Sequence, residues 1–259
     1  MEDVRGVSPE KKCVQTQYGE IPYDYLVIAT GSTHSYFGHD EWSRYAPGLS
    51  DYASKTLTRV GVEVRTETLV TKCDADGVDL KDGRIDAGTV IWAAGVTASP
   101  AMRWLNAESD RAGRVKVNSD LSLPGHPEIF VVGDTASVTD KNGHPVPGIA
   151  PAAKQMGTYV GKLISARIAG REWNKPFKYM HLGELATIGR RAAVVKFGPL
   201  ELKGFIGWVF WSVAHIYFLI GLRNRFVVAF NWFWDYVTFQ RGARLITDPP
   251  NSGGAGRDA

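Results

Sequence analysis

The apolar residues of this chain fall into short runs that end in small residues. Three such runs are Tyr25–Ala29, Thr89–Ala93 and Ile129–Val132, and a glycine follows each within two positions. Continuous apolar runs of this length are typical of strands that are covered on both faces, as in parallel sheets. Residues 152–169 are predicted as a helix because Pro151 precedes them and Gly170 follows. This alternation of strands and helix predicts an α/β fold.

Shorter elements are predicted between and after these runs. The pattern favours a helix over residues 51–59 and, because apolar and polar residues alternate, a strand over residues 62–66. Residues 78–85 are predicted as a hairpin because Asp82-Gly83 is a strong turn signal. Two further short β segments are expected within residues 185–202.

The C-terminal part of the chain is apolar and aromatic. Residues 204–222 form a 19-residue stretch without formal charge, and residues 226–239 form a second helix candidate. Length alone would allow the first stretch to span a bilayer. Tryptophan favours the membrane–water interface, however, so two helices lying in the interface are the preferred prediction. A homodimer formed through these aromatic faces is the alternative. The region holds half of the eight tryptophans: Trp208, Trp211, Trp232 and Trp234.

Charge and cysteine content bear on which partners and which covalent or metal sites the chain can have. The net charge is only +3, so no nucleic-acid partner is predicted. Cys13 and Cys73 lie far apart and form no redox or zinc motif, so neither a disulfide framework nor a metal site is expected. Basic residues are concentrated near the apolar helices, which points to an anionic surface. They are Arg223, Arg225, Arg241 and Arg244, against Asp235 as the single acid.

The predicted strand ends are the candidate ligand site, because ligands of open α/β sheets lie at the carboxyl ends of strands. Thr30-Gly31 allows close backbone approach, and Asp134, after Gly133, places a carboxylate where it can accept hydrogen bonds from ribityl or ribose hydroxyls. Ala152-Ala153 begins a helix whose N-terminus favours negative charge. Each feature also has an ordinary structural interpretation as a turn or as small-residue packing.

The order of these motifs resembles that of flavoproteins with two dinucleotide-binding domains, and the flanking sequence is similar to type II NADH dehydrogenases. The resemblance extends from Tyr23 to Thr247 and is specific, since disulfide reductases of the same fold do not share the C-terminal segments. The residues that carry it are Ala29-Thr-Gly31, Trp92-Ala-Ala-Gly95, Val132-Gly-Asp134, Ala152-Ala-Lys-Gln155, Ser35–Gly38, Gly183–Arg190, Gly204–Trp211 and His215–Arg225.

The resemblance implies roles for individual residues. Asp134, after Gly133, matches the aspartate that binds the FAD ribityl chain, and Ala29-Thr30-Gly31 matches the motif that passes near FAD. Ala94-Gly95 matches the corresponding motif on the NADH side. Ala152, Ala153 and Gln155 fall in the helix that lies between flavin and quinone in the family. Many relatives have a second glutamine where this chain has Pro151, which leaves that contact to quinone in doubt.

The family also implies two glycine-rich pyrophosphate loops, each a GxGxxG motif between a strand and a helix. The only GxG in the sequence is Gly254-Ala-Gly256, in a tail over residues 248–259 that is predicted to be disordered. One loop would be expected before residue 1 and the other between Ser50 and Asp51. An N-terminal truncation and an internal deletion would account for both, and the chain alone is then expected to retain FAD weakly.

The resemblance implies a domain plan and an activity. Residues 1–50 and 107–180 would form two parts of an FAD-binding domain of Rossmann type, with residues 51–106 a remnant of the NADH-binding domain. Residues 181–247 would anchor the chain to the cytoplasmic face of a bacterial inner membrane. The implied activity is electron transfer from NADH through FAD to quinone, with no side chain acting as acid or base. Another pyridine-nucleotide flavoprotein reductase, acting on ferredoxin or sulfide, and a non-catalytic membrane-bound remnant stay open as alternatives.

Overall fold

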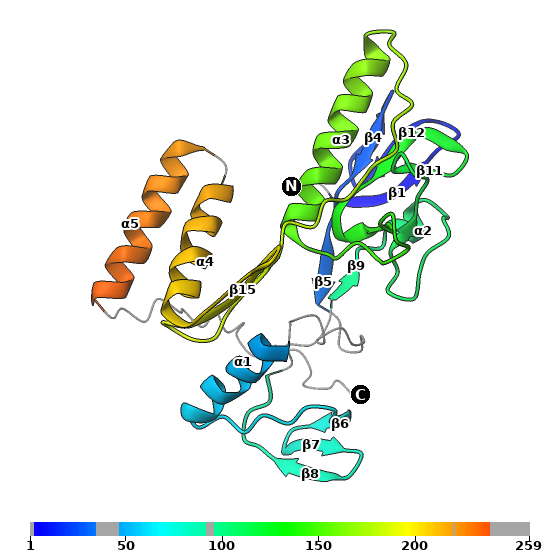
Figure 1. Ribbon diagram of the computed structural model, residues 1–259. Coiled ribbons are helices and arrows are strands. Elements are labelled where there is room, and N and C mark those ends of the chain that lie inside the picture. Colours follow the sequence, from blue (N-terminus) through cyan, green and yellow to red (C-terminus); the bar gives the residue numbers. More distant parts are fainter. Residues whose placement is uncertain (1–2, 35–46, 92–95, 220, 239–259) are drawn as a thin grey trace, which may run out of the picture. The chain divides into compact units, whose positions relative to one another are not determined.

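The computed structural model describes residues 3–34, 47–91, 96–219 and 221–238 (Figure 1). These residues belong to two compact units. The first unit comprises residues 1–46 and 61–183, and the second comprises residues 47–60 and 184–259. The predicted tail over residues 248–259 lies outside the described residues.

The first unit is built from small sheets and one long helix. Its strands are β1 (Val4–Ser8), β2 (Cys13–Thr16), β3 (Gly19–Pro22), β4 (Leu26–Ile28), β5 (Ser32–His34), β6 (Val70–Asp74), β7 (Gly77–Leu80), β8 (Gly83–Asp86), β9 (Val96–Ala98), β10 (Val115–Lys116), β11 (Ser122–Leu123), β12 (His126–Val131) and β13 (Ala136–Ser137). Its helices are α2 (Ala101–Trp104), the 3₁₀ turn η1 (Gly133–Thr135) and α3 (Ala150–Ile168). The strands pair in the orders β1-β2-β3, β11-β12-β4, β6-β7-β8, β10-β13 and β5-β9.

Strand β12 is buried on both faces, as its continuous apolar sequence predicts. It runs parallel to β4, with Ile129 opposite Leu26. Ile129 packs in a cluster with α2 and β10, whereas Phe130 packs in a second cluster with Leu163 of α3. Because alternate side chains of a strand point to opposite faces, α3 covers one face and the α2 side covers the other. The prediction of an α/β fold is therefore confirmed.

One predicted strand is wrong, and the described part of a second forms no strand. Residues 62–66 are fully described, form no strand and are exposed throughout. Their alternating pattern has no neighbouring strand to pair with among the described residues, and alternation alone does not supply one. In the predicted strand Thr89–Ala93, residues 89–91 also form none, and Ile91 is 85% exposed. Residues 92–93 lie outside the described residues, and the next strand along the chain is β9.

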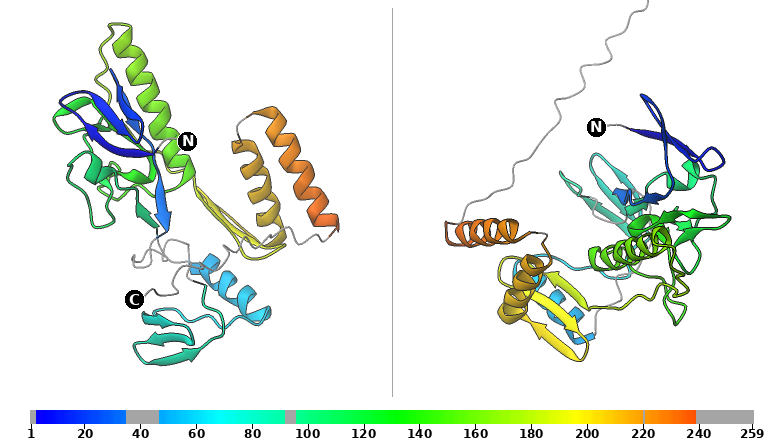
Figure 2. Two further views of the ribbon diagram at one scale, coloured as in Figure 1. Left: turned by 180° about the vertical axis from the view of Figure 1, so that it is seen from behind. Right: turned by 90° about the horizontal axis from the view of Figure 1, so that it is seen from above.

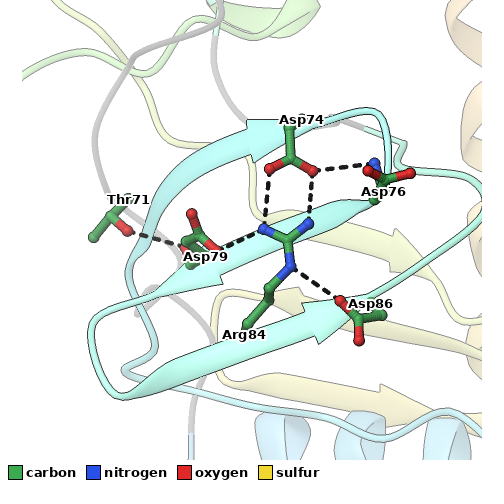
Figure 3. Close-up of polar contacts among 6 residues, drawn as sticks. All are labelled: Thr71, Asp74, Asp76, Asp79, Arg84 and Asp86. Carbon is green, nitrogen blue, oxygen red and sulfur yellow. Dashed lines mark hydrogen bonds and ion pairs between the residues drawn. The ribbon is translucent and has the colours of Figure 1, made fainter.

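The three-stranded meander β6-β7-β8 contains one arginine surrounded by carboxylates (Figure 3). Arg84 forms a two-point contact with Asp74, with each nitrogen–oxygen distance at most 3.0 Å. Its guanidinium also donates to Asp79 at 2.7 Å and to Asp86 at 2.9 Å. Hydrogen bonds from Arg84, and then from the backbone N–H of Asp76, hold the pKa of Asp74 well below its ordinary value.

Replacing Arg84 by methionine should raise the pKa of Asp74 towards its ordinary value, because the largest cause of its depression is removed. In the native chain, ionised Asp74 stabilises the folded state at every pH above the pKa that this group has in the unfolded chain. The stabilisation is lost as the pH falls through the lower pKa that it has in the folded chain. The pKa can be followed by NMR of the Asp74 side-chain carbon. Arg84→Lys, which keeps the charge, should give a smaller rise, and an unchanged pKa in the methionine variant would contradict the assignment.

The second unit combines an antiparallel sheet with three helices. These elements are α1 (Pro47–Arg59), β14 (Glu184–Thr187), β15 (Ala193–Phe197), β16 (Leu200–Lys203), α4 (Gly204–Phe218) and α5 (Leu222–Thr238). The sheet order is β14-β15-β16, so the sequence prediction of two β segments was one strand short. Helix α4 packs on β15 at Gly207, which is buried.

Helices α4 and α5 lie side by side in every view (Figures 1 and 2). Trp211 stacks on Trp232 with ring centroids 5.5 Å apart, and Trp208 stacks on Tyr236 at 5.2 Å. The apolar stretch 204–222 does not form one helix, because α4 ends at Phe218 and the backbone of Leu219 is extended. Position 220 lies outside the described residues. None of the described helices combines the length and the apolar character that crossing a bilayer requires.

Candidate functional site

The carboxyl ends of β4 and β12 place two predicted site segments together. Because Ile28 pairs with Val131 in the parallel ladder, the chain leaves both strands at the same edge. The segments that follow contain Gly31 and Asp134. The hydroxyl of Thr135 donates to the carbonyl of Gly31 at 3.0 Å and joins them directly.

The Asp134 carboxylate lies partly buried at this edge. Its Oδ2 accepts a hydrogen bond from the hydroxyl of Ser32 at 2.9 Å. Its Oδ1 faces the backbone of Gly148, where an added Cβ would lie only 3.3 Å away. A carboxylate has about four acceptor positions, so a ligand hydroxyl can still bind to it. The sequence indicated Asp134 but gave no reason to choose Ser32 or Gly148.

Small residues separate Asp134 from the start of α3. Gly133 has a φ of +72°, which favours glycine, and a Cβ there would lie 3.5 Å from that of Ala153. Ala152 is buried. Helix α3 has Ile149 at its N-cap, no side-chain cap and no acidic residue in its first turn. The partial positive charge of this helix end is therefore not offset locally by an acidic side chain of the helix, which suits a ligand that carries negative charge.

Thr135 and Ser99 hold the backbone of Gly31. Thr30 and Ser99 share a hydrogen bond between their hydroxyl groups, and the backbone N–H of Ser99 donates to the carbonyl of Gly31 at 3.1 Å. That carbonyl also accepts from Thr135, which is completely buried. Gly31 is held in this way at a φ of +68°. Sequence reasoning missed Ser99 and Thr135 because single small polar residues form no pattern.

Gln155 contacts the chain that follows α3. Its Nε2 donates to the carbonyl of Met180 at 2.9 Å, and its Oε1 accepts from the N–H of Met180 at 2.9 Å. Both ends of the amide are therefore used by one backbone position. Its placement between flavin and quinone stays a prediction. Ala29 is exposed at the end of β4, whereas Ala94 and Gly95 lie outside the described residues.

The arrangement is suited to binding rather than to acid–base chemistry. Among the described residues, no group of histidine, cysteine, aspartate and glutamate side chains is placed to hold a metal ion. The site offers one carboxylate, backbone groups at two strand ends, small side chains and a helix N-terminus. Such a set can orient a ligand with hydroxyl groups and a flat ring, and can stabilise negative charge on it.

Comparison with known families agrees with this geometry. Residues 40–157 match the family model for pyridine nucleotide-disulphide oxidoreductases, and residues 181–240 match the model for the NDH2 C-terminal domain. The chain is 40% identical over 211 residues to the type II NADH:quinone oxidoreductase Ndh of Mycobacterium tuberculosis. The chain belongs to the type II NADH dehydrogenase family.

The sequence matches to relatives cover most of this chain but less than half of each relative. The match to Mycobacterium Ndh covers 77% of the chain but 44% of Ndh, so the chain spans less than half the length of that relative. The alternative NAD(P)H-ubiquinone oxidoreductase A1 of Arabidopsis thaliana is 30% identical, with 76% of this chain and 42% of the plant protein covered. The structure of NDH2 from Plasmodium falciparum in complex with NADH has a TM-score of 0.76 at 15% identity, covers 92% of this chain and 82% of its own, and shows the shared fold.

The match to the NDH2 C-terminal domain covers β14–β16, α4 and α5. Helix α1 groups with this segment, whereas residues 61–106 group with the first unit. The assignment of residues 51–106 to a remnant of the NADH-binding domain stays a prediction.

Proposed function

We propose that the protein represented by this chain passes electrons from NADH through FAD to a membrane quinone, without pumping protons. The observation that carries the proposal is the placement of Asp134 beside Gly148 and the N-terminus of α3. The names of the relatives support the same reaction, since Mycobacterium Ndh is a type II NADH:quinone oxidoreductase.

The described residues fit one end of FAD. Asp134 would accept hydrogen bonds from ribityl hydroxyls, and Gly133, which has no side chain, packs close to Ala153 beside it. The N-terminus of α3 would stabilise negative charge on the reduced ring. When bound, FAD would supply the redox chemistry between NADH and quinone. The residues of this chain would bind and orient it, and no side chain need transfer a proton.

The quinone would be reached from a membrane surface on which α4 and α5 lie. Exposed apolar side chains are frequent on both helices, and one stripe of them runs along each helix. The α4 stripe comprises Ile206, Val209, Val213 and Tyr217, and the α5 stripe comprises Leu222, Phe226, Phe230, Phe233 and Val237, while Phe205, Phe218, Val227, Trp232 and Trp234 are exposed outside the stripes. Spacings of three and four residues place each set on one side of its helix. We place this surface at the cytoplasmic face of a bacterial inner membrane, and a homodimer stays a prediction.

The proposal can be tested by equilibrium titration of the purified chain with FAD, followed by flavin fluorescence. Because the sequence contains no glycine-rich pyrophosphate loop, we expect weak but saturable binding that is lost on washing. Asp134→Ala should weaken it by about tenfold or more, since it removes charge-assisted hydrogen bonds. Asp82→Asn, in an exposed turn, is the matched control. Equal binding by wild type and Asp134→Ala would contradict the site, and no binding at all would favour the non-catalytic remnant.

A further inference from the structure

A second candidate site lies on the outward side of α3, away from the residues that contact Asp134. A hollow of about 680 Å³ is formed between the second half of α3 and the segment that follows it. This volume lies within the range of roughly 300–1,000 Å³ that is typical of small-molecule sites. Thr158, Gly161, Lys162 and Ser165 line it from one side of the helix, because they are spaced three and four residues apart.

The other wall is fixed by contacts of Tyr159. Its hydroxyl donates to the carbonyl of Lys175, and its ring packs edge-on against Trp173 and Phe177 with centroids 5.8 and 5.6 Å away. At the helix end, the backbone N–H of Arg171 donates to the carbonyl of Ala166 at 2.9 Å. The backbone positions of both cationic residues in this wall are therefore set by the fold.

The hollow is positively charged. Lys162, Arg171 and Lys175 line it, and within the described ranges none of the three has a carboxylate at ion-pair distance. The one acid in the lining, Glu172, accepts a hydrogen bond from Asn174 at 3.3 Å. Cations near a helix C-terminus can serve only to offset the helix dipole, but that effect is confined to the last turn. Lys162 lies six positions before Ile168, the last residue of α3, so the dipole does not account for it.

We propose that this hollow binds a phosphate group, carried either by a small soluble ligand or by a lipid headgroup. Three cations line this one hollow, and charge-assisted hydrogen bonds from such groups to phosphate oxygens are the strong ones. Gly161 lines the hollow without a side chain, and a Cβ there would meet nothing within 4 Å. The space beside this residue is therefore open to a ligand. The proposal is independent of FAD binding, since the hollow shares no residue with the site at Asp134.

The test is calorimetric titration of the full chain with inorganic pyrophosphate at low salt. Saturable binding is expected, and the double variant Lys162→Gln, Lys175→Gln should weaken it by about tenfold or more. The control is Lys81→Gln, Lys141→Gln, which removes the same charge from exposed turns and should bind as wild type. Equal weakening in both double variants, or no saturable binding to any probe, would overturn the proposal.

A parallel series identifies the source of the phosphate. The chain is floated with phosphatidylcholine vesicles that contain or lack phosphatidic acid. If the phosphate comes from a soluble ligand, the Lys162 and Lys175 variant should lose pyrophosphate binding and float as wild type. If the phosphate belongs to a lipid headgroup, the same variant should float with phosphatidylcholine vesicles as wild type does. It should not show the increase in flotation that phosphatidic acid causes for the wild type. A variant that differs from its control in neither series would contradict the hollow as a site.

Discussion

Replacing Phe226 and Phe230 by aspartate should release the chain from lipid vesicles. The two side chains are 74% and 64% exposed and lie one turn apart on α5. Burying one phenylalanine in an apolar environment contributes about 1.5–3 kcal/mol, so losing two should lower the partition coefficient by about a hundredfold or more. The two introduced charges add a further cost at the interface. Vesicle flotation of wild type and variant measures the effect.

The matched control changes exposed apolar residues elsewhere in the same way. Tyr18 and Ile91 are 76% and 85% exposed in the first unit, so Tyr18→Asp, Ile91→Asp adds the same charge without touching α5. This control should float as wild type does. If both double variants detach equally, net charge rather than the α5 stripe governs binding. If neither detaches, the proposed membrane surface is wrong.

Gly207→Ala should loosen the second unit, although helix propensity alone predicts the opposite. An alanine in a helix interior is favoured over glycine by about 1 kcal/mol. At Gly207, however, the new Cβ would lie 2.7 Å from the carbonyl oxygen of Ala193 and 3.3 Å from that of Leu202. Both are backbone atoms of the sheet that α4 covers, so they cannot rotate away. Overpacking of this kind costs about 1–3 kcal/mol, so after the propensity gain the net destabilisation is up to about 2 kcal/mol.

Hydrogen exchange of the α4 and β15 amides measures this loss, since both elements meet at Gly207. Gly157→Ala is the control, because Gly157 also lies in a helix interior but a Cβ there would meet nothing within 4 Å. That variant should gain about 0.5–1 kcal/mol. Protection of α4 that stays equal to wild type in Gly207→Ala would show that the helix can shift off the sheet without cost.

The candidate site could be predicted from the sequence only where its residues follow a strand directly. Asp134 and Gly31 were indicated because each comes just after an apolar run, and parallel strands end at the same edge. Ser99 lies 69 positions from Thr30, and Ser32 lies 102 positions from Asp134. No local pattern links such pairs, since their contact depends on how β4, β9 and β12 are brought together.

By itself the sequence determined the elements that short-range signals encode: the apolar strand β12, the helix α3, which contains Pro151 in its first turn and ends shortly before Gly170, and the turn at Lys81 and Asp82 between β7 and β8. These depend on covalent geometry and on the nearest few residues. The tertiary structure alone decided which alternating segments become strands, because a strand needs a partner for its backbone hydrogen bonds. It also decided the break after Phe218. Arg225 covers the ring of Tyr217 and donates to the carbonyl of Leu219 at 2.9 Å, contacts that stabilise two short helices in place of one long one.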